Sequence, residues 1–379
     1  MVNLKLTSNK DLIYYYPMGS GAPSDISRKI FKYLLVHRED LPFENIKIFC
    51  KKKNVTKIKE ELKDVNIITY SDLGKISHNS LIHIPVLPSI LPNSKFLLYI
   101  YCTHIKKTKV VLQYHGDVRG ELKISYKDVV SLAHILTYLF VPNILKSADA
   151  VLVHSNYMND IIHNYGVNKS FVISNAIETD WLKPLEKEIC IEQSINKKSY
   201  NIFYHGRLSW EKGVDLLIDA VFFCLKNNYS NIILYLAGDG PSRRYLEKLC
   251  CRLGIENNVV FLGNLDKKTI KWFLKDVDVA IYPSRFDAFS LAILEALSCS
   301  NCNVYFSKKA GIYNFVIKDG FKLHAFEPSV ENIIKIIEQK EFVDKSELQK
   351  EFAKKYTFDS VVFDYIKLYT NVIDDINSN

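Results

Sequence analysis

The chain has 379 residues, 48% of them hydrophobic, and a formal net charge of +8 at pH 7. This length exceeds one ordinary hydrophobic core and predicts two domains of roughly 180 residues each. The hydrophobic content is that of a globular protein, and the longest apolar stretch, Val129 to Leu145, is interrupted by polar residues and a proline, so no segment is expected to span a bilayer.

The excess positive charge lies in the first half of the chain. Residues 1–200 hold 27 Lys and Arg against 19 Asp and Glu, whereas residues 201–379 hold 23 of each. A basic face suits an anionic ligand or an anionic membrane surface, although a solvated face without a partner explains the same charges. The run Lys51–Lys53 has no interleaved aromatic residues, so we expect an exposed helix face and no nucleic-acid binding.

The first half alternates predicted strands and helices. Asp11–Met18 reads as a strand, a Gly19-Ser20-Gly21 turn follows, and Pro23 opens a helix. The amides of Gly19 and Gly21 could approach a phosphate or a sugar, or the turn could be purely structural. Alternation of strands and helices predicts a parallel, doubly wound sheet. Further strands are predicted at Ile46–Cys50, Val65–Tyr70, Leu81–Val86, Val110–Tyr114, Ala150–His154 and Phe171–Ser174.

A polar segment with a proline, Lys183–Ser199, is predicted to link the two domains. The first domain is then 1–182 and the second 200–355, with strands expected at Ile202–His205, Ile232–Ala237, Val259–Leu262, Val279–Tyr282 and Asn303–Phe306.

The expected location is the cytoplasm. The amino terminus lacks the apolar core and cleavage site of a signal peptide, and the eight cysteines show no disulfide framework spacing. Cys299 and Cys302 form a C-x-x-C, but no second pair or suitably spaced His completes a zinc site, so we expect buried small residues.

The segment YHGRLSWEKGVDLLIDAV, residues 204–221, predicts a strand, a turn freed by Gly206 and an amphipathic helix. Arg207 and Lys212 flank the amino end of that helix. Free amides and the helix dipole favour a phosphate there, and two fixed cations would strengthen the site. The alternative is a pair of surface charges that hold the loop in salt bridges.

The segment SRFDAFSLAILEALSC, residues 284–299, follows the buried strand Val279–Tyr282. It places Asp287 in a loop and Glu295 about two turns inside the following helix. One carboxylate could therefore meet a ligand from the loop and the other from the helix. Alternatively, Asp287 caps the helix and Glu295 is an ordinary helical acid.

These two segments and LAGDGPSRRYLEKLCCRLGIENNVVFLG, residues 236–263, resemble the retaining, nucleotide-sugar-dependent glycosyltransferases of family 4. The resemblance spans nearly the whole chain and is densest from Asn201 to Gly320. It implies a GT-B fold: two Rossmann-like doubly wound domains facing a cleft, with a closing helix, about 356–379, that returns to the first domain.

The resemblance also implies residue roles. Arg207 and Lys212 would bind the donor phosphates, Glu295 the nucleotide ribose, and Asp287 with the adjoining backbone amides the sugar hydroxyls. His115, in the YHGD segment that follows a strand, matches the family histidine near the reacting carbon, although a lone His is more often structural. The predicted donor-binding set also includes Gly19, Gly21 and Gly206 from their turns, and Ala288, Phe289, Ser290 and Leu291 beside Asp287.

The chain departs from the family pattern at several positions. The first acid of the two-Glu signature is Asp287, and Ala288 and Ser290 replace glycines. If either needs a positive φ, it would be strained. The later glycine pair is Ala310-Gly311, and the acid expected shortly after is Asn314.

The predicted activity is transfer of a sugar from a UDP- or GDP-sugar to a glycan, lipid-linked or other hydroxyl acceptor, with peripheral membrane contact through the first domain and no cofactor. We expect no catalytic metal, because Asp276-Val277-Asp278 precedes a strand and lies at the wrong end of the sheet. The alternatives are a non-catalytic scaffold that kept the fold, a sugar-nucleotide epimerase, or a phosphorylase, the last disfavoured by the lack of a cofactor-lysine site.

Overall fold

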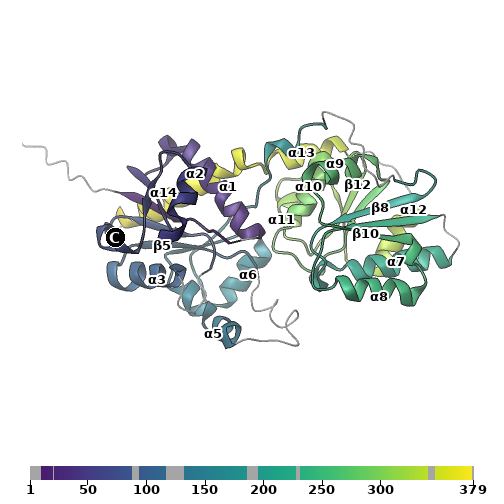
Figure 1. The fold of residues 1–379 in the computed structure, drawn as a ribbon, viewed down its shortest axis with the longest axis horizontal. Coiled ribbons are helices and arrows are strands. Elements are labelled where there is room, and N and C mark those ends of the chain that lie inside the picture. The colour runs from purple at the N-terminus through teal and green to yellow at the C-terminus, as the bar shows by residue number, and fades with distance from the viewer. Residues whose placement is uncertain are drawn as a thin grey trace, which may run out of the picture. The chain divides into compact units, whose positions relative to one another are not determined.

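The computed structural model describes residues 10–19, 21–87, 94–116, 132–185, 195–227, 231–339 and 346–377, and the side chains of all of these except residues 94, 132–138 and 375–377. Contacts divide the chain into two units. The first comprises Met1–Ile173 and Phe358–Asn379, and the second comprises Ser174–Thr357. Figure 1 shows both units as sheets flanked by helices.

The first unit is built on a parallel sheet of seven strands in the order β3-β2-β1-β4-β5-β6-β7. Strands such as AVLV in β6 are buried along their whole length, as expected where helices cover both faces of a sheet. The strands are β1 (Asp11–Tyr15), β2 (Asn45–Phe49), β3 (Asn66–Ile68), β4 (Leu81–Ile84), β5 (Lys109–Gln113), β6 (Ala150–Val153) and β7 (Ser170–Val172). The helices are α1 (Ala22–Val36), α2 (Val55–Glu61), α3 (Ser94–Ile100), α5 (Leu132–Lys146), α6 (Asn156–Asn164) and α14 (Phe358–Asn377).

The C-terminal helix α14 returns to the first unit, as the resemblance implied. It packs beside α1 and buries Tyr365 and Tyr369 completely or nearly so. The Tyr369 hydroxyl lies 2.6 Å from Nδ1 of His83 in β4, and Gln113 in β5 donates to the Tyr365 hydroxyl at 3.3 Å. Buried polar contacts therefore fix the helix against the sheet in one position.

The second unit holds a parallel sheet of six strands in the order β10-β9-β8-β11-β12-β13. Helices α7, α8 and α12 form one layer, and α9, α10 and α13 form another. The strands are β8 (Tyr200–His205), β9 (Ile232–Ala237), β10 (Val259–Gly263), β11 (Val279–Tyr282), β12 (Asn303–Ser307) and β13 (His324–Phe326). The helices are α7 (Val214–Lys226), α8 (Arg243–Leu253), α9 (Lys267–Asp276), α10 (Leu291–Cys299), α11 (Ile312–Lys318), α12 (Val330–Gln339) and α13 (Ser346–Lys354).

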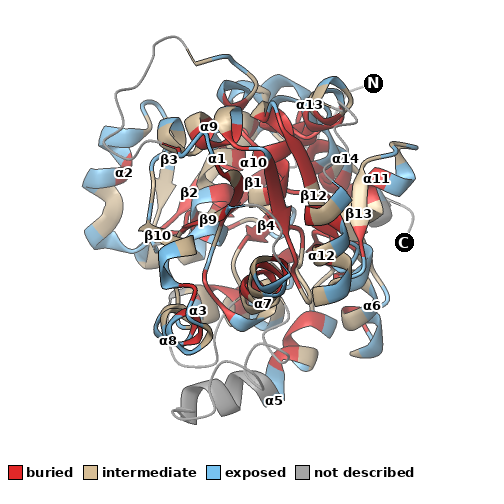
Figure 2. Cartoon of the chain, turned by 90° about the vertical axis from the view of Figure 1, so that its right-hand side faces the viewer, coloured by how far each residue is buried: buried red, intermediate tan, exposed pale blue. Residues whose placement is uncertain are grey.

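The sheets carry the cores. Figure 2 shows the central strands as buried, with exposed residues on the outer faces of the helices. In β8 and β11 every residue but Tyr200 is buried, which explains their apolar sequences. Within the described part of the chain, no helix combines the length and the apolarity needed to cross a membrane.

Residues 174–182, which the sequence analysis assigned to the first domain, are grouped with the second unit. The reason is local pairing: Ile177 bridges to Thr357, and the buried Lys271 donates to the carbonyl of Asp180 at 3.0 Å. Of the expected linker, residues 186–194 lie outside the described residues. The edge strand β13 was not predicted, because three residues are too few for a period-two pattern.

Candidate functional site

The residues predicted to bind phosphate and sugar follow two neighbouring strands of the second sheet. β8 and β11 pair side by side, although β9 and β10 lie between them in the sequence. The chain leaves β8 toward one edge and later adds β11 on the other side. A parallel sheet opens a crevice at the carboxyl ends of its strands where the order switches in this way. The loops after β8 and β11 therefore border one site.

The loop after β8 runs from Gly206 to Gly213 and is packed against backbone. Gly213 has a φ of 67° at the start of α7, and a Cβ there would lie 2.1 Å from the carbonyl oxygen of Pro283. Gly238 approaches from the end of β9, where a Cβ would lie 2.0 Å from the carbonyl oxygen of Gly206. Only glycine fits at either position. The guanidinium of Arg207 is exposed and has no hydrogen-bonding or ionic partner among the described residues.

Lys212 joins the two predicted motifs. Its amine forms an ion pair with the Asp287 carboxylate, and both side chains are mostly buried, at 21% and 11% exposed. Lys212, predicted to bind the phosphate, is thus in direct contact with Asp287, predicted to bind the sugar, although 75 positions separate them in the chain. An ammonium has three N–H donors, so Lys212 can keep Asp287 in place and still bind an anion.

Arg285 fixes the same two loops, which the sequence analysis did not foresee. Its guanidinium makes a bidentate contact with Asp215 in α7, at 2.7 and 2.6 Å, and donates to the carbonyl of Trp210 at 2.8 Å. It also lies 4.8 Å from the Trp210 ring centre. Arg285 and Asp215 are 70 positions apart, so no local sequence pattern could predict that they pair. Bidentate geometry makes this one of the stronger classes of ion pair.

Glu295 lies in α10 and is held by a buried relay that the sequence analysis also missed. His205, the last residue of β8, is 4% exposed, and its Nε2 donates to the Glu295 carboxylate at 3.1 Å. Its Nδ1 then accepts from the Tyr282 hydroxyl, at 2.7 Å. Burial raises the pKa of Tyr282 well above its usual value, so the hydroxyl remains a donor. These two hydrogen bonds fix the orientation of Glu295, which is predicted to bind the ribose.

The segment from Asp287 to Leu291 lies against the loop after β12. The amide of Asp287 donates to the carbonyl of Lys309 at 3.3 Å, and the amide of Gly311 donates to the carbonyl of Asp287 at 2.9 Å. Phe289 is buried against Phe315, with ring centres 5.6 Å apart. This side chain anchors the loop, so at Phe289 only the backbone can face a ligand. The Ala310-Gly311 pair thus positions Asp287.

Ala288 and Ser290 stand where the family pattern has glycines, and of these two only Ser290 adopts a positive φ. It has a φ of 80° immediately before α10, whereas Ala288 is not among the described non-glycine residues with positive φ. A left-handed L-residue costs about 1–2 kcal/mol, and the Ser290 side chain makes no capping bond that would offset the cost. The condition for strain is therefore met at Ser290 and not at Ala288.

Replacing Ser290 with glycine is expected to raise the free energy of unfolding by about 0.5–1 kcal/mol, because the relieved strain exceeds the added entropy of the unfolded chain. Urea unfolding followed by tryptophan fluorescence measures the change, since Trp181, Trp210 and Trp272 all lie in the second unit. Ser242→Gly is the control, because Ser242 has a φ of −85° and should lose stability when replaced. A Ser290→Gly protein no more stable than the parent would contradict the strain.

The remaining predicted residues lie in the first unit. His115 follows β5, donates from Nε2 to the carbonyl of Pro85 at 2.8 Å, and lies 4.8 Å from the ring centre of His154. Burial lowers the pKa of His115 to about 4, so its imidazole is neutral and Nδ1 is an acceptor. Gly19 and Gly21 follow β1. Gly21 has a φ of 102° at the amino end of α1, and the carbonyl of Gly19 accepts from Arg28 at 3.0 Å.

The two aspartates of the D-x-D pattern have partners within the protein, and the two cysteines of the C-x-x-C pattern are neutral thiols. The Asp278 carboxylate accepts from the amide of Asn201 at 2.7 Å, and Asp276 pairs with Lys197 at 3.4 Å. Both acids precede β11, at the end of the sheet opposite Asp287. Burial raises the pKa values of Cys299 and Cys302 to about 12, so both are neutral thiols.

The chain is similar to known proteins in sequence and in fold. The model of the family described as "Glycosyl transferases group 1" matches residues 186–356, nearly the whole second unit, including the loops that carry Lys212 and Asp287. The second unit therefore resembles the group 1 glycosyltransferases. The chain is 27% identical over 280 residues to an uncharacterized glycosyltransferase of Methanocaldococcus jannaschii, a match that covers 70% of each chain.

A second curated relative has a named activity. Over 197 residues the chain is 27% identical to a phosphatidylinositol N-acetylglucosaminyltransferase polypeptide of Arabidopsis thaliana, and the match covers 51% of this chain but only 42% of the relative. Among solved structures, Anabaena HepE in complex with UDP matches with a TM-score of 0.64 at 16% identity, covering 96% of this chain and 100% of that one. The fold of the chain is GT-B.

Proposed function

We propose that the protein moves a hexose from a UDP- or GDP-sugar to a hydroxyl acceptor with retention of anomeric configuration, as a member of family 4. The observation that carries this proposal is the ion pair between Lys212 and Asp287, because it joins a phosphate-binding loop to a sugar-binding loop at the switch point of the second sheet. The UDP bound in Anabaena HepE supports a nucleotide-sugar donor.

The chemistry follows from where charge develops. The bond between the anomeric carbon and the diphosphate breaks, a bond to the acceptor oxygen forms on the same face, and the acceptor's proton passes to the departing phosphate. Negative charge grows on the leaving group. Arg207, exposed and unpaired among the described residues, and Lys212 are proposed to stabilise it, as fixed cations do most effectively. No metal ion is required for this step.

The remaining contacts are assigned by hydrogen-bonding chemistry. Glu295, oriented by His205, is proposed to accept from the ribose hydroxyls. The Asp287 carboxylate and the amides from Ala288 to Leu291 are proposed to bind the sugar hydroxyls, because the first amides of a helix have no partners inside it. Proposed contacts in the first unit are His115, Gly19 and Gly21, with the neutral His115 imidazole as a hydrogen-bond acceptor.

The acceptor is proposed to be lipid-linked or a glycan. The lipid named in the activity of the Arabidopsis relative and the excess of basic residues in residues 1–200 support this choice. The proposed location is the cytoplasm with peripheral contact to the inner membrane face, which agrees with a cysteine pattern that lacks disulfide framework spacing.

A donor screen tests the function. We expect the protein to bind one UDP- or GDP-sugar and to transfer or slowly hydrolyse it, with a product of the donor's anomeric configuration by NMR. EDTA should change the rate less than about twofold, since the phosphate charge is neutralised by side chains. Donor binding without turnover on added glycan and lipid acceptors would indicate a scaffold, and inverted product or loss of activity in EDTA would refute retention or metal independence, respectively.

A further inference from the structure

A cavity lies in the second unit, at the end of its sheet opposite the loops that carry Lys212 and Asp287. It has a volume of about 300 Å³ and is lined where α9 and α10 end, before β11 and β12 begin. Lys212 and Asp287, by contrast, follow the carboxyl ends of β8 and β11. The cavity is therefore separate from the proposed donor site. Its size lies at the lower limit of small-molecule pockets.

Among the described residues, the lining of this cavity carries positive charge and no carboxylate. Four of its ten residues are lysines, namely Lys183, Lys271, Lys275 and Lys350, and none is acidic. Two carboxylates pair with these lysines from outside: Asp180 lies 3.7 Å from Lys183, and Glu347 lies 3.4 Å from Lys350. They are 59% and 88% exposed, so solvent weakens both pairs.

Helix ends do not cancel the remaining charge. The carboxyl ends of α9 and α10 border the cavity, and each contributes a partial charge of about −0.5. Together they offset about one of the four ammonium charges. The Cys299 thiol in the lining is neutral, because burial raises its pKa to about 12. A net positive cavity remains.

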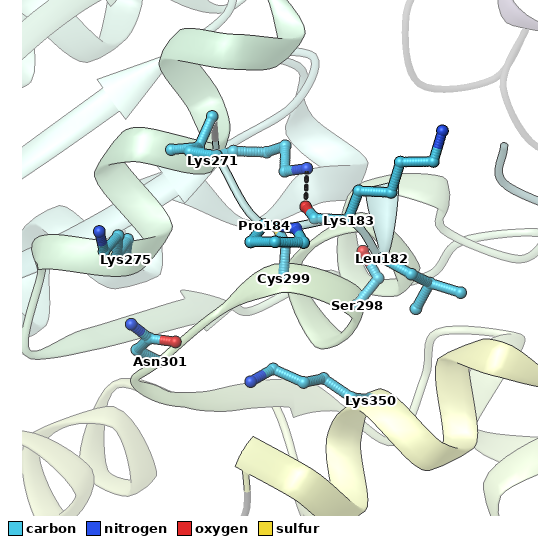
Figure 3. Close-up of a pocket in the computed structure, with 10 residues that line it drawn as sticks. Leu182, Lys183, Pro184, Lys271, Lys275, Ser298, Cys299, Asn301 and Lys350 are labelled. Carbon is cyan, nitrogen blue, oxygen red and sulfur yellow. Dashed lines mark hydrogen bonds between the residues drawn. The ribbon is translucent and has the colours of Figure 1, made fainter. Parts of the chain in front are cut away.

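One buried lysine of the lining, Lys271, is held by backbone carbonyls. Lys271 is 6% exposed and donates to the carbonyls of Asp180 and Lys183. Two carbonyls leave one N–H of its ammonium without an acceptor among the described residues. Figure 3 shows its amine reaching the Lys183 carbonyl, with Lys350 extending toward Asn301. Within the same described residues, Lys275 and the Asn301 side chain have no hydrogen-bonding or ionic partner.

We propose that this cavity is a binding site for a small phosphate-bearing molecule, with Lys271, Lys275 and Lys350 as the cationic ligands and the Asn301 amide as a neutral donor. Phosphate groups carry up to two charges and several acceptor oxygens, which match clustered ammonium groups better than a single carboxylate does. A cavity of this volume excludes a polymeric anion from binding inside it. The site does not depend on the proposed function.

Isothermal titration calorimetry with sodium pyrophosphate tests the proposal, at an ionic strength matched with sodium chloride. We expect the parent to show binding that persists in Arg207→Ala/Lys212→Ala, which removes the donor-site cations, and that weakens at least tenfold in Lys275→Gln/Lys350→Gln. The matched control is Lys248→Gln/Lys318→Gln, which removes two exposed lysines that do not line the cavity. Loss of binding in Arg207→Ala/Lys212→Ala alone would assign the pyrophosphate to the donor site and overturn the proposal.

Lysine footprinting on the unmodified protein makes the test independent of how the variants fold. Pyrophosphate should slow acetylation of Lys275 and Lys350 relative to Lys248 and Lys318 by at least threefold, as measured by mass spectrometry. Equal protection of all four lysines, or protection by sodium chloride alone, would show only general screening and would overturn the proposal.

Discussion

Replacing Lys212 with alanine is expected to lower kcat for sugar transfer at least about 100-fold. The lost ammonium would stabilise charge that exists on the leaving group only as the bond breaks, and removal of one such group typically costs about 3–4 kcal/mol of transition-state stabilisation. Steady-state kinetics with the donor found in the screen measure the change.

Two control variants distinguish a catalytic effect of Lys212→Ala from a structural one. Lys212→Arg keeps a cation beside Asp287 and should retain more activity than alanine does. Lys248→Ala removes an exposed lysine elsewhere in the second unit and should be silent. The alanine variant leaves the 11% exposed Asp287 carboxylate without Lys212, so its unfolding must be checked by tryptophan fluorescence. A rate loss under about tenfold in a folded protein would contradict the assigned role.

Replacing Gly213 with alanine is expected to destabilise the second unit by at least about 3 kcal/mol and to abolish transfer. The new Cβ would need a φ of 67° and would lie 2.1 Å from the Pro283 carbonyl oxygen, so backbone must move at the junction of the two loops. That movement would separate Lys212 from Asp287. Urea unfolding, again read by the three tryptophans, measures the loss.

Gly254→Ala is the matched control for Gly213→Ala. Gly254 has nearly the same φ, 68°, but a Cβ there has nothing within 4 Å. It should therefore lose only the left-handed strain, about 1–2 kcal/mol, and keep its activity. Similar losses of stability in the two variants would show that the close approach at Gly213 is unimportant.

Most of the fold could be predicted from local pattern. Each predicted strand is present within a few residues, because the strands of buried parallel sheets are apolar along their length and the intervening helices repeat at helical spacing. Strand β13 escaped because His324–Phe326 is too short to show a period. The helix predicted to follow the Asp287 loop begins at Leu291, immediately after Ser290 with its φ of 80°.

The site was only half predictable. Arg207, Lys212, Asp287 and Glu295 carried signals in their spacing around turns and helix starts. The residues that hold these side chains in place carried no such signal. In the sequence, His205 is an ordinary strand residue and Arg285 an ordinary surface charge. Their contacts are with Glu295 and Asp215, 90 and 70 positions away, which no local spacing reveals.

The sequence by itself determined the elements, the chemistry of the two loops and the cationic and acidic side chains they carry, because those depend on neighbours within one turn of chain. Tertiary structure alone decided that β8 and β11 are adjacent, that Lys212 meets Asp287, and that four lysines surround one cavity. The physical reason is that sheet order and helix packing join segments with no sequence periodicity in common, so their contacts arise only when the whole second unit folds.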